Sequence, residues 1–280
     1  MMRYILRAST GFTIVEMLIA VLLACLVAAA GLNFYVSAHN QLVSQQDISD
    51  AQHNLRNSVD EIARQLKNAG SNIPGYILPI EAANNNPDSI VIRFASIKGR
   101  ADVGDHTQKS QATPVHVAKG SDLSGFAIGD KVYFWHSATR TGEWFTISSV
   151  ATNLGSGWEE IGHQGLDFAS DPMPGDLILA MQEIQYFVNR SDTLHPMLMR
   201  TINGEPPQIY ADDIFDLQFT FFTSKPDTVD VPAATDTVFA ARVSMTAYTA
   251  SEDVEAVKFG HAGRKSRSMN TEVLIRNRRT

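Results

Sequence analysis

Glu16 is the single formally charged residue in the most apolar stretch of the chain, which runs from Phe12 to Val36. A carboxylate within a membrane-length apolar segment costs free energy, so such residues usually have a partner. Gly11 stands five positions before Glu16 and closes a leader, residues 1–11, whose charged residues are two arginines. The sequence therefore presents a carboxylate that requires a partner, directly after a short basic leader.

Other side chains that could perform chemistry show no catalytic or metal-binding pattern. The eight histidines are scattered and form no HExxH pair: His39, His53, His106, His116, His136, His163, His195 and His261. Gly155-Ser156-Gly157 lacks the last glycine of a dinucleotide fingerprint, which would stand at Glu160, and no Walker or GxSxG motif is present. Cys25 is the only cysteine, which excludes an internal disulfide and cysteine-ligated zinc. We therefore expect no enzyme activity, no catalytic residue, no metal and no cofactor.

The apolar stretch is long enough to cross a membrane, because its residues would span about 37 Å as a helix at 1.5 Å per residue. Arg3 and Arg7 precede it, which by the positive-inside rule places the N-terminus in the cytoplasm and the residues after Val36 on the other side. Two general classes share these features. A cleaved secretory signal would use the small residues Ala28-Ala29-Ala30. An ordinary single-pass anchor would explain the length but not Glu16.

The string Gly11-Phe12-Thr13-Ile14-Val15-Glu16-Met17-Leu18-Ile19-Ala20 closely resembles the processing signature of type IV prepilins and pseudopilins. That signature has a glycine, an aromatic residue, a threonine or serine, two apolar residues, a glutamate and a leucine-rich run. In such proteins the prepilin peptidase cuts after the glycine on the cytoplasmic face and N-methylates the new first residue. The resemblance implies cleavage between Gly11 and Phe12 and N-methylation of Phe12.

The resemblance also implies a partner for the carboxylate in the apolar run. After cleavage Phe12 would bear a cationic amine, and in a helical stack the amine of one subunit can meet Glu16 of a neighbour. A wrong axial offset would leave the carboxylate unpaired in hydrocarbon. We therefore expect Glu16 to be the charge that specifies register during subunit assembly.

The residues after Val36 predict that the apolar helix continues into a polar one. Apolar side chains at spacings of three and four form one stripe: Ile48, Ala51, Leu55, Val59, Ile62 and Leu66. No proline interrupts the chain before Lys67, and we expect the helix to end at Asn68-Ala69-Gly70, shortly before Pro74. The stripe is expected to pack under the chain's own head domain; packing between subunits is the alternative, and both can hold on different faces.

From Ile77 onward, short alternating runs separated by turn residues predict strands. The candidates are Ser89–Ala95, Lys131–His136, Glu143–Val150, Leu177–Asn189, Met197–Ile202, Asp216–Phe222, Ala240–Ala250 and Thr271–Arg276. Asn203-Gly204 is expected to form a hairpin turn, and the polar segments 99–125 and 151–176 are expected to be loops. The predicted fold is α+β, a long N-terminal helix packed on a mainly antiparallel β-sheet head.

Charged segments of the head are expected to be solvated. Four aspartates lie in or before the insertion 225–236, and without EF-hand spacing they predict loop acids in place of a calcium site: Asp216, Asp227, Asp230 and Asp236. A late basic group is expected to be a solvated loop that balances an acidic domain: Arg264, Lys265, Arg267, Arg276, Arg278 and Arg279. The formal charge of −7 argues against sequence-independent binding of nucleic acid, and it leaves a local basic patch open.

The head carries a second resemblance, to the PilW-type minor pilins and the J-type pseudopilins of type II secretion. Its motifs are Asn68-Ala69-Gly70, Ile128–Tyr133, Ile184–Val188 followed by Met197–Arg200, Asp213–Phe219, Ala241–Thr246 and Thr271–Arg278, in that order. The resemblance implies a minor pilin that initiates or caps a type IV filament. The alternatives are a J-type minor pseudopilin and, from another class, a bitopic extracytoplasmic binding or sensor module with an uncleaved N-terminus.

The same resemblance implies a division of the chain and a set of partners. Residues 1–11 would be the leader, 12–36 the transmembrane or filament-core half of the helix, 37–70 its amphipathic half and 71–280 the extracytoplasmic head. The implied partners are other minor and major pilins or pseudopilins, the prepilin peptidase and an inner-membrane assembly platform. The implied location is the bacterial inner membrane, single-pass with the head periplasmic, and then the pilus or pseudopilus at its tip.

Overall fold

The structure is a computed structural model that describes residues 12–152, 157–165, 167–224, 228–233, 236–252 and 263–275. It divides into two units. The first contains residues 1–50 and 251–265, and the second contains residues 51–250 and 266–280.

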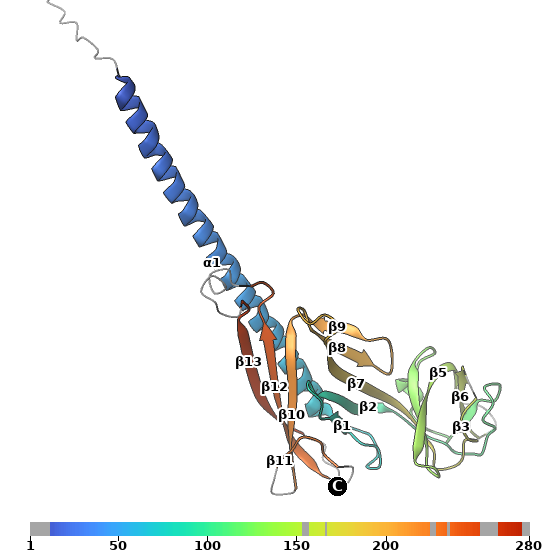
Figure 1. The fold of residues 1–280 in the computed structure, drawn as a ribbon. Coiled ribbons are helices and arrows are strands. Elements are labelled where there is room, and N and C mark those ends of the chain that lie inside the picture. The colour runs from blue at the N-terminus through green and yellow to red at the C-terminus, as the bar shows by residue number, and fades with distance from the viewer. Residues whose placement is uncertain are drawn as a thin grey trace, which may run out of the picture. The chain divides into compact units, whose positions relative to one another are not determined.

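One helix, α1 (Ile14–Asn68), confirms the continuous helix that the sequence predicts (Figure 1). It contains no proline, which would remove a backbone hydrogen bond and clash with the preceding turn. Its end also agrees with the prediction, because Gly70 adopts a φ of 77° and Ser71 N donates to Asn68 O (3.0 Å). A left-handed glycine at this position terminates a helix without the steric cost that a Cβ would bring.

The apolar stripe on the second half of α1 is buried within the second unit. Leu55, Val59, Ile62 and Leu66 are each no more than 1% exposed. They belong to a core cluster that also takes apolar residues from strands of both sheets. The predicted packing of the stripe under the head is therefore confirmed for residues 51–66, whereas Ile48 is half-buried and belongs to the first unit.

The head consists of strands paired antiparallel, as the sequence predicts. A nine-stranded sheet contains β1 (Ile80–Ala83), β2 (Ser89–Asp102), β3 (Val115–Val117), β4 (Lys131–His136), β5 (Thr141–Ala151), β6 (Glu159–Gln164), β7 (Leu177–Asn189), β8 (Met197–Ile202) and β9 (Gln208–Ala211). A four-stranded sheet contains β10 (Ile214–Thr223), β11 (Thr228–Val229), β12 (Val238–Tyr248) and β13 (Ser266–Leu274). A short 3₁₀ helix, η1 (Leu123–Gly125), lies between β3 and β4.

Each predicted strand overlaps an observed one, and β4, β7 and β8 have the predicted bounds. The hairpin turn is also confirmed. Asn203 and Gly204 have φ values of 49° and 68°, and Glu205 N donates to Ile202 O (2.9 Å). Two successive residues of positive φ form the turn whose twist matches that of antiparallel strands.

The two segments predicted as loops, 99–125 and 151–176, instead contribute strands to a closed β-barrel. Its strands follow the order β2, β7, β4, β5, β6 and β3. Val103, directly after β2, bridges to Val117 of β3 and thereby closes the sheet. The prediction was wrong because β3 and β6 are short and carry polar side chains between their few apolar ones. Only closure of the barrel makes one face of such strands an interior face.

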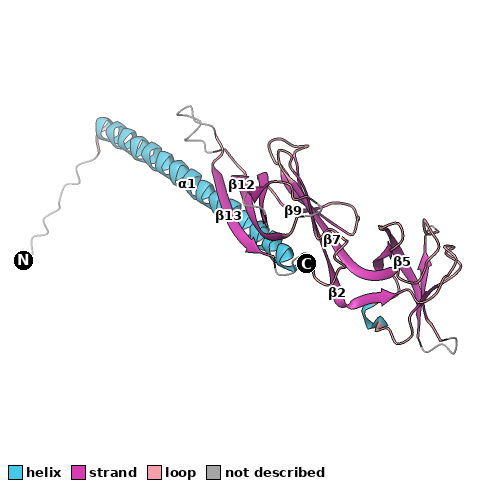
Figure 2. Cartoon of the chain, turned by 90° about the horizontal axis from the view of Figure 1, so that it is seen from below, coloured by secondary structure: helices cyan, strands magenta, loops and turns pink. Residues whose placement is uncertain are grey.

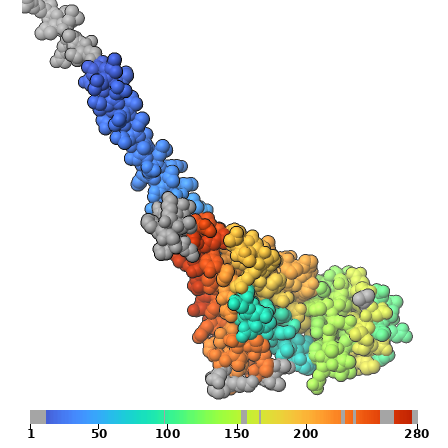
Figure 3. Space-filling model, in the orientation of Figure 1, coloured from blue at the N-terminus to red at the C-terminus, as the bar shows by residue number. Residues whose placement is uncertain are grey.

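The barrel has a core of its own within the second unit. Its buried members are Ala101, Val103, Val115, Val117, Leu123, Phe126, Val132, Phe134, Phe145, Ile147, Ile161, Phe168 and Ile178. The long strands β2 and β7 contribute to this core and to the core under α1, and they lie between β9 and β5 in Figure 2. In Figure 3 the barrel residues, green to yellow, gather at the opposite end of this unit from the four-stranded sheet, orange to red.

Asp88 connects the two sheets. Its backbone N donates to Leu217 O (2.8 Å), and its carboxylate accepts hydrogen bonds from Phe219 N (2.8 Å) and Asn85 N (3.1 Å). Burial raises the pKa of this carboxyl, against the opposing effect of the two backbone donors. The backbone N–H and the side-chain carboxylate of Asp88 thus tie the start of β2 to the backbone of β10.

Candidate functional site

Of the two residues at the predicted processing site, Gly11 and Phe12, the structure describes Phe12. Gly11 lies outside the described residues. Phe12 is described and is 80% exposed. Phe12 and Thr13 precede the first helical residue, Ile14. The described chain therefore begins with an exposed aromatic side chain on non-helical backbone.

Glu16 has a hydrogen-bonding partner within its own chain. Its Oε2 accepts hydrogen bonds from Thr13 N (2.9 Å) and Thr13 Oγ1 (3.0 Å), and Glu16 N donates to Thr13 Oγ1 (3.2 Å). This reciprocal pattern is a capping box, which satisfies N–H groups that the first turn of a helix leaves free. The T-x-x-E spacing of Thr13 and Glu16 is the sequence signature of this motif, so the carboxylate has a partner inside its own chain as well as the expected one from a neighbouring subunit. Glu16 therefore helps to cap the N-terminal end of α1, in addition to any role between subunits.

The first half of α1 has an apolar surface on all sides. Every residue from Phe12 to Val36 is exposed within this structure. In the described part of the chain, α1 is the one helix long and apolar enough to cross a membrane, and it lies near the N-terminus. An apolar surface of this extent requires lipid or other protein to cover it. The helix is consistent with a single-pass membrane anchor.

Unlike Glu16, the carboxylate of Glu61 on α1 is buried in the head. Glu61 is 7% exposed, and its Oε1 accepts hydrogen bonds from Gln65 Nε2 (2.8 Å) and Tyr186 OH (3.3 Å). The Arg64 guanidinium donates to Oε2, and Arg200 Nη1 lies 3.9 Å from Oε1. Burial raises the pKa of Glu61, but the hydrogen bonds outweigh it and hold that pKa below its ordinary value. This network connects α1 to β7 and β8. The sequence does not reveal it, because a glutamate on the polar part of a helix is ordinarily exposed to solvent.

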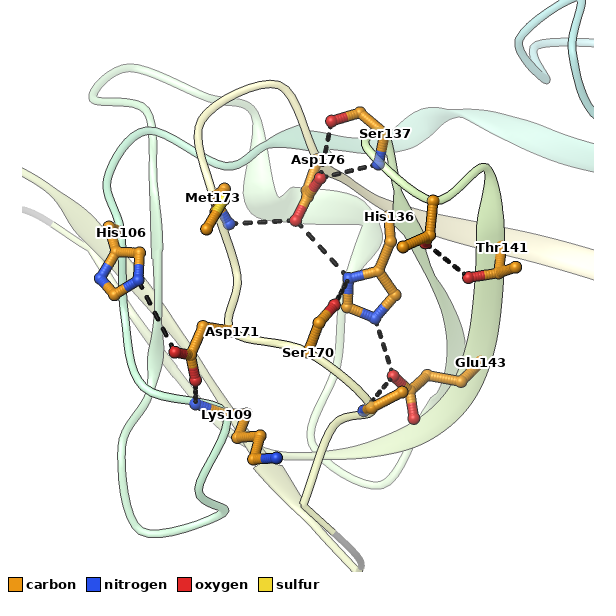
Figure 4. A network of polar contacts seen from close by, with 12 residues as sticks. His106, Lys109, His136, Ser137, Thr141, Glu143, Ser170, Asp171, Met173 and Asp176 are labelled. Atoms are coloured by element: carbon orange, nitrogen blue, oxygen red, sulfur yellow. Dashed lines mark hydrogen bonds and ion pairs between the residues drawn. The ribbon is translucent and has the colours of Figure 1, made fainter.

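The barrel contains a histidine network that the sequence does not predict (Figure 4). His136 Nε2 lies 2.8 Å from Glu143 Oε1, and its Nδ1 lies 2.9 Å from Ser170 Oγ and 3.7 Å from Asp176 Oδ2. A carboxylate, an imidazole and a hydroxyl in series also occur in nucleophilic hydrolases. Here the side chains of His136 and Asp176 are each 3% exposed, so the imidazole is closed off from solvent.

The histidine network fastens the segment 167–176 to the barrel. Glu143 Oε1 also accepts a hydrogen bond from Ala169 N (2.8 Å). Asp176 Oδ1 accepts hydrogen bonds from the backbone N and the hydroxyl of Ser137 (2.8 Å each). Buried polar groups without partners would destabilise the barrel, and these contacts supply the partners. We interpret the network as a structural clasp between loops.

The acidic residues of the head form no metal site in the part of the chain that the structure describes, where no group of three His, Cys, Asp or Glu side chains could hold an ion. Asp216 lies within β10, so its prediction as a loop residue was wrong. Asp230 lies in a loop and accepts a hydrogen bond from Asn84 Nδ2 (3.2 Å). Asp236 also lies in a loop, and Asp227 is outside the described residues.

The basic group near the C-terminal end is not the continuous loop that the sequence predicts. Arg267 lies in β13, which begins at Ser266. The first half of this strand is polar and shows little alternation of apolar and polar side chains, so the sequence predicts a strand only from Thr271. Lys265 Nζ donates to Ser44 Oγ (3.2 Å). The remaining arginines, Arg276, Arg278 and Arg279, lie outside the described residues.

Comparisons with known proteins give a match to one solved structure. No family model matches the sequence, and no curated protein matches it. The solved structure of the type IV-like pilin TTHA1219 from Thermus thermophilus is similar over 81% of this chain and 97% of that chain, with 9% identity and a TM-score of 0.35. At these values the alignment transfers no residue roles. The α+β fold, a long N-terminal helix with an antiparallel β head, is established by the elements themselves and agrees with the prediction.

Proposed function

We propose that this chain is a structural subunit of a type IV filament, a minor pilin that initiates or caps pilus assembly. The observation that carries the proposal is the division of α1. Its first half exposes an apolar surface on every side, and its second half is packed into a β head. A helix of this kind can leave the bilayer for a filament core while the head stays folded.

The proposal includes processing of the N-terminus. Residues 1–11 are the leader, the prepilin peptidase cleaves between Gly11 and Phe12, and Phe12 becomes the N-methylated first residue. The cleavage signature and the exposed, non-helical Phe12 before Ile14 support this assignment. Residues 12–36 then lie in the inner membrane and later in the filament core, residues 37–70 continue the helix, and residues 71–280 form the periplasmic head.

Glu16 has two roles in this proposal. Before assembly, the capping box with Thr13 satisfies the carboxylate inside its own chain. During assembly, the cationic amine of a neighbouring Phe12 attracts the same carboxylate, and this attraction favours one axial offset between the two subunits. The hydrogen bonds to Thr13 lower the cost of keeping a charged residue in the membrane before assembly. The attraction to the amine of a neighbouring Phe12 explains why this residue is a carboxylate.

The mass of the mature N-terminus tests the proposal. We expect the purified protein to begin at Phe12 with one added methyl group. A chain that begins at Met1 supports the sensor-module alternative, and one that begins after Ala30 supports a secretory signal. Gly11→Val is expected to block cleavage while membrane insertion continues, because insertion depends on the apolar run and not on the scissile bond.

Three variants separate the two roles of Glu16. Glu16→Gln keeps an oxygen acceptor for the capping box but loses the charge, and Glu16→Ala loses both. Thr13→Val keeps the charge and the backbone donor but loses the hydroxyl. If the charge directs assembly, Glu16→Gln incorporates into filaments as poorly as Glu16→Ala, and Thr13→Val incorporates better than either. Wild-type incorporation of Glu16→Gln contradicts the intersubunit pairing.

Deletion of the gene distinguishes a pilus subunit from a J-type pseudopilin. Loss of pili with normal secretion supports the minor pilin, and loss of type II secretion with normal pili supports the pseudopilin. The expected partners differ in the same way, since they are the other pilins or pseudopilins of the affected system and its inner-membrane platform.

A further inference from the structure

The four-stranded sheet has a long open edge. Its order β11-β10-β12-β13 leaves β13 outermost, and no strand in the described part of the chain pairs with the far side of β13 (Figure 1). The other strands at sheet ends are short, with four residues each in β1 and β9 and two in β11. β13 has nine residues. Proteins normally shorten, bend or cover such an edge, because its unpaired backbone groups bind other strands.

The pairing of β12 with β13 shows which groups the edge offers. The two strands pair over nine successive residue pairs without a register shift, whereas the β10–β12 and β2–β7 pairings both shift. The edge is therefore regular. Ile275 N donates to Phe239 O (3.0 Å), and in an antiparallel ladder alternate residues bond to the same neighbour. The even-numbered residues consequently direct their N–H and C=O groups outward: Ser266, Ser268, Asn270, Glu272 and Leu274.

The side chains along β13 define what an added strand would need. Side chains alternate between the faces of a sheet, so Arg267, Met269 and Thr271 share one face. Met269 packs, partly buried, against the core under α1. An incoming strand with apolar side chains at alternate positions would extend this core. Arg267 is exposed, and its guanidinium donates to Ser266 O (3.0 Å) with no carboxylate partner among the described residues. An acid opposite Arg267 would supply one.

A second copy of β13 fits this edge less well than a different strand. Symmetric antiparallel pairing would put the Arg267 side chains of both copies on the apolar face. The acid of the same strand, Glu272, alternates to the other face, where it pairs with Arg242. Neither guanidinium would gain a partner.

We propose that β13 is a docking edge for an extended segment of a different filament subunit, which adds a strand to the four-stranded sheet. The segment carries apolar side chains at alternate positions and a carboxylate opposite Arg267. The identity of the partner as a filament subunit rests on the proposed function, whereas the chemistry of the edge does not.

Amide hydrogen exchange on the full chain in detergent tests the edge directly. The probe is a synthetic peptide of the length of β13, with alternating valine and threonine and one glutamate. We expect the amides of Ser268, Asn270 and Glu272 to exchange rapidly alone and about tenfold more slowly with the peptide, because added strand bonds must open first. The same amides are expected to be protected in assembled filaments.

Asn270→Pro and Asn270→Ala form a matched pair. Proline removes the outward N–H at a position where edge strands tolerate it, so the thermal unfolding of the head should remain close to wild type. We expect the peptide to protect the edge of Asn270→Ala but not of Asn270→Pro. Arg267→Glu should weaken binding about two- to fivefold, the scale of an exposed ion pair, and a peptide with lysine in place of glutamate should restore it.

The outcomes separate this proposal from the proposed function. If the chain enters filaments normally but neither assembly nor the peptide protects the even-numbered amides, the docking edge is wrong and the filament role stands. If the chain never enters filaments but the peptide protects the edge as described, the filament role is wrong and the edge stands as a strand-binding site.

Discussion

Truncation of Ile62 tests whether the second half of α1 is an integral part of the head. Ile62 is fully buried in the core that joins α1 to both sheets. Ile62→Ala removes about three carbon groups at roughly 0.8 kcal/mol each and leaves a cavity, so the expected loss is about 2–5 kcal/mol of unfolding free energy. Leu42→Ala is the matched control, because Leu42 lies on the same helix but is 65% exposed.

Urea unfolding of the full chain in detergent measures this loss. With a slope of roughly 2–3 kcal/mol per molar, the midpoint for Ile62→Ala should fall by about 0.7–2.5 M, and that for Leu42→Ala should hardly change. Circular dichroism follows the helix and sheets together. The three tryptophans, Trp135, Trp144 and Trp158, lie in or beside barrel strands, so their fluorescence follows the barrel.

Comparison of the two signals shows how far the effect extends. The long strands β2 and β7 contribute residues to both cores, and also to a separate cluster of buried residues (Ile77, Ala95, Trp135, Leu177, Leu179 and Met181). We therefore expect fluorescence and circular dichroism to shift together for Ile62→Ala. If Ile62→Ala shifts neither signal more than Leu42→Ala does, the stripe does not stabilise the head and faces other subunits instead.

Three further predictions concern the head. Asp88→Ala should lower the unfolding free energy by about 1–3 kcal/mol, because Phe219 N loses its acceptor, and Asp88→Asn should recover part of it in the same urea assay. Tyr186→Phe should cost about 1 kcal/mol through loss of the hydrogen bond to Glu61, and this cost should vanish in a Glu61→Ala background measured as a double-mutant cycle. Burial lowers the pKa of His163, so the unfolded chain, with an ordinary value near 6.5, takes up the proton first. The stability that the neutral ring contributes is complete above about pH 6.5 and falls as the pH drops toward the lower folded value, and a His163→Phe variant that kept the same dependence between pH 7.5 and 5.5 in urea unfolding would contradict this assignment.

Two buried histidines of the barrel, His136 and His163, differ in their surroundings. His136 and His163 are both buried in the barrel, but His136 has carboxylate and hydroxyl partners, whereas His163 stacks on Phe168 with ring centroids 4.0 Å apart. Neither ring nitrogen of His163 makes a hydrogen bond of good geometry, and the nearby backbone groups of Thr113 and Ser110 only partly oppose the effect of burial on its pKa. Burial therefore disfavours the charged form of the His163 ring.

Local pattern alone determined the helix and most of the long strands. Apolar spacing of three and four places Leu55 and Ile62 on one helix face, and alternation marks β7 and β8, because these periods follow from backbone geometry within a few residues. The capping box of Thr13 and Glu16 is equally local, since it is a contact between residues three positions apart.

Tertiary structure alone decided the barrel, the Glu61 and His136 networks and the open edge of β13. Val115 of β3 and Ile161 of β6 are paired although they lie 46 positions apart in the chain, and their short polar strands acquire an interior only when the Val103–Val117 bridge closes the sheet. Glu61 becomes a buried carboxylate because Tyr186, far along the chain, is folded against it. Such features depend on which distant segments of the chain pack together. The free energy that favours this packing comes from burial of the whole core, and no local spacing of residues encodes it.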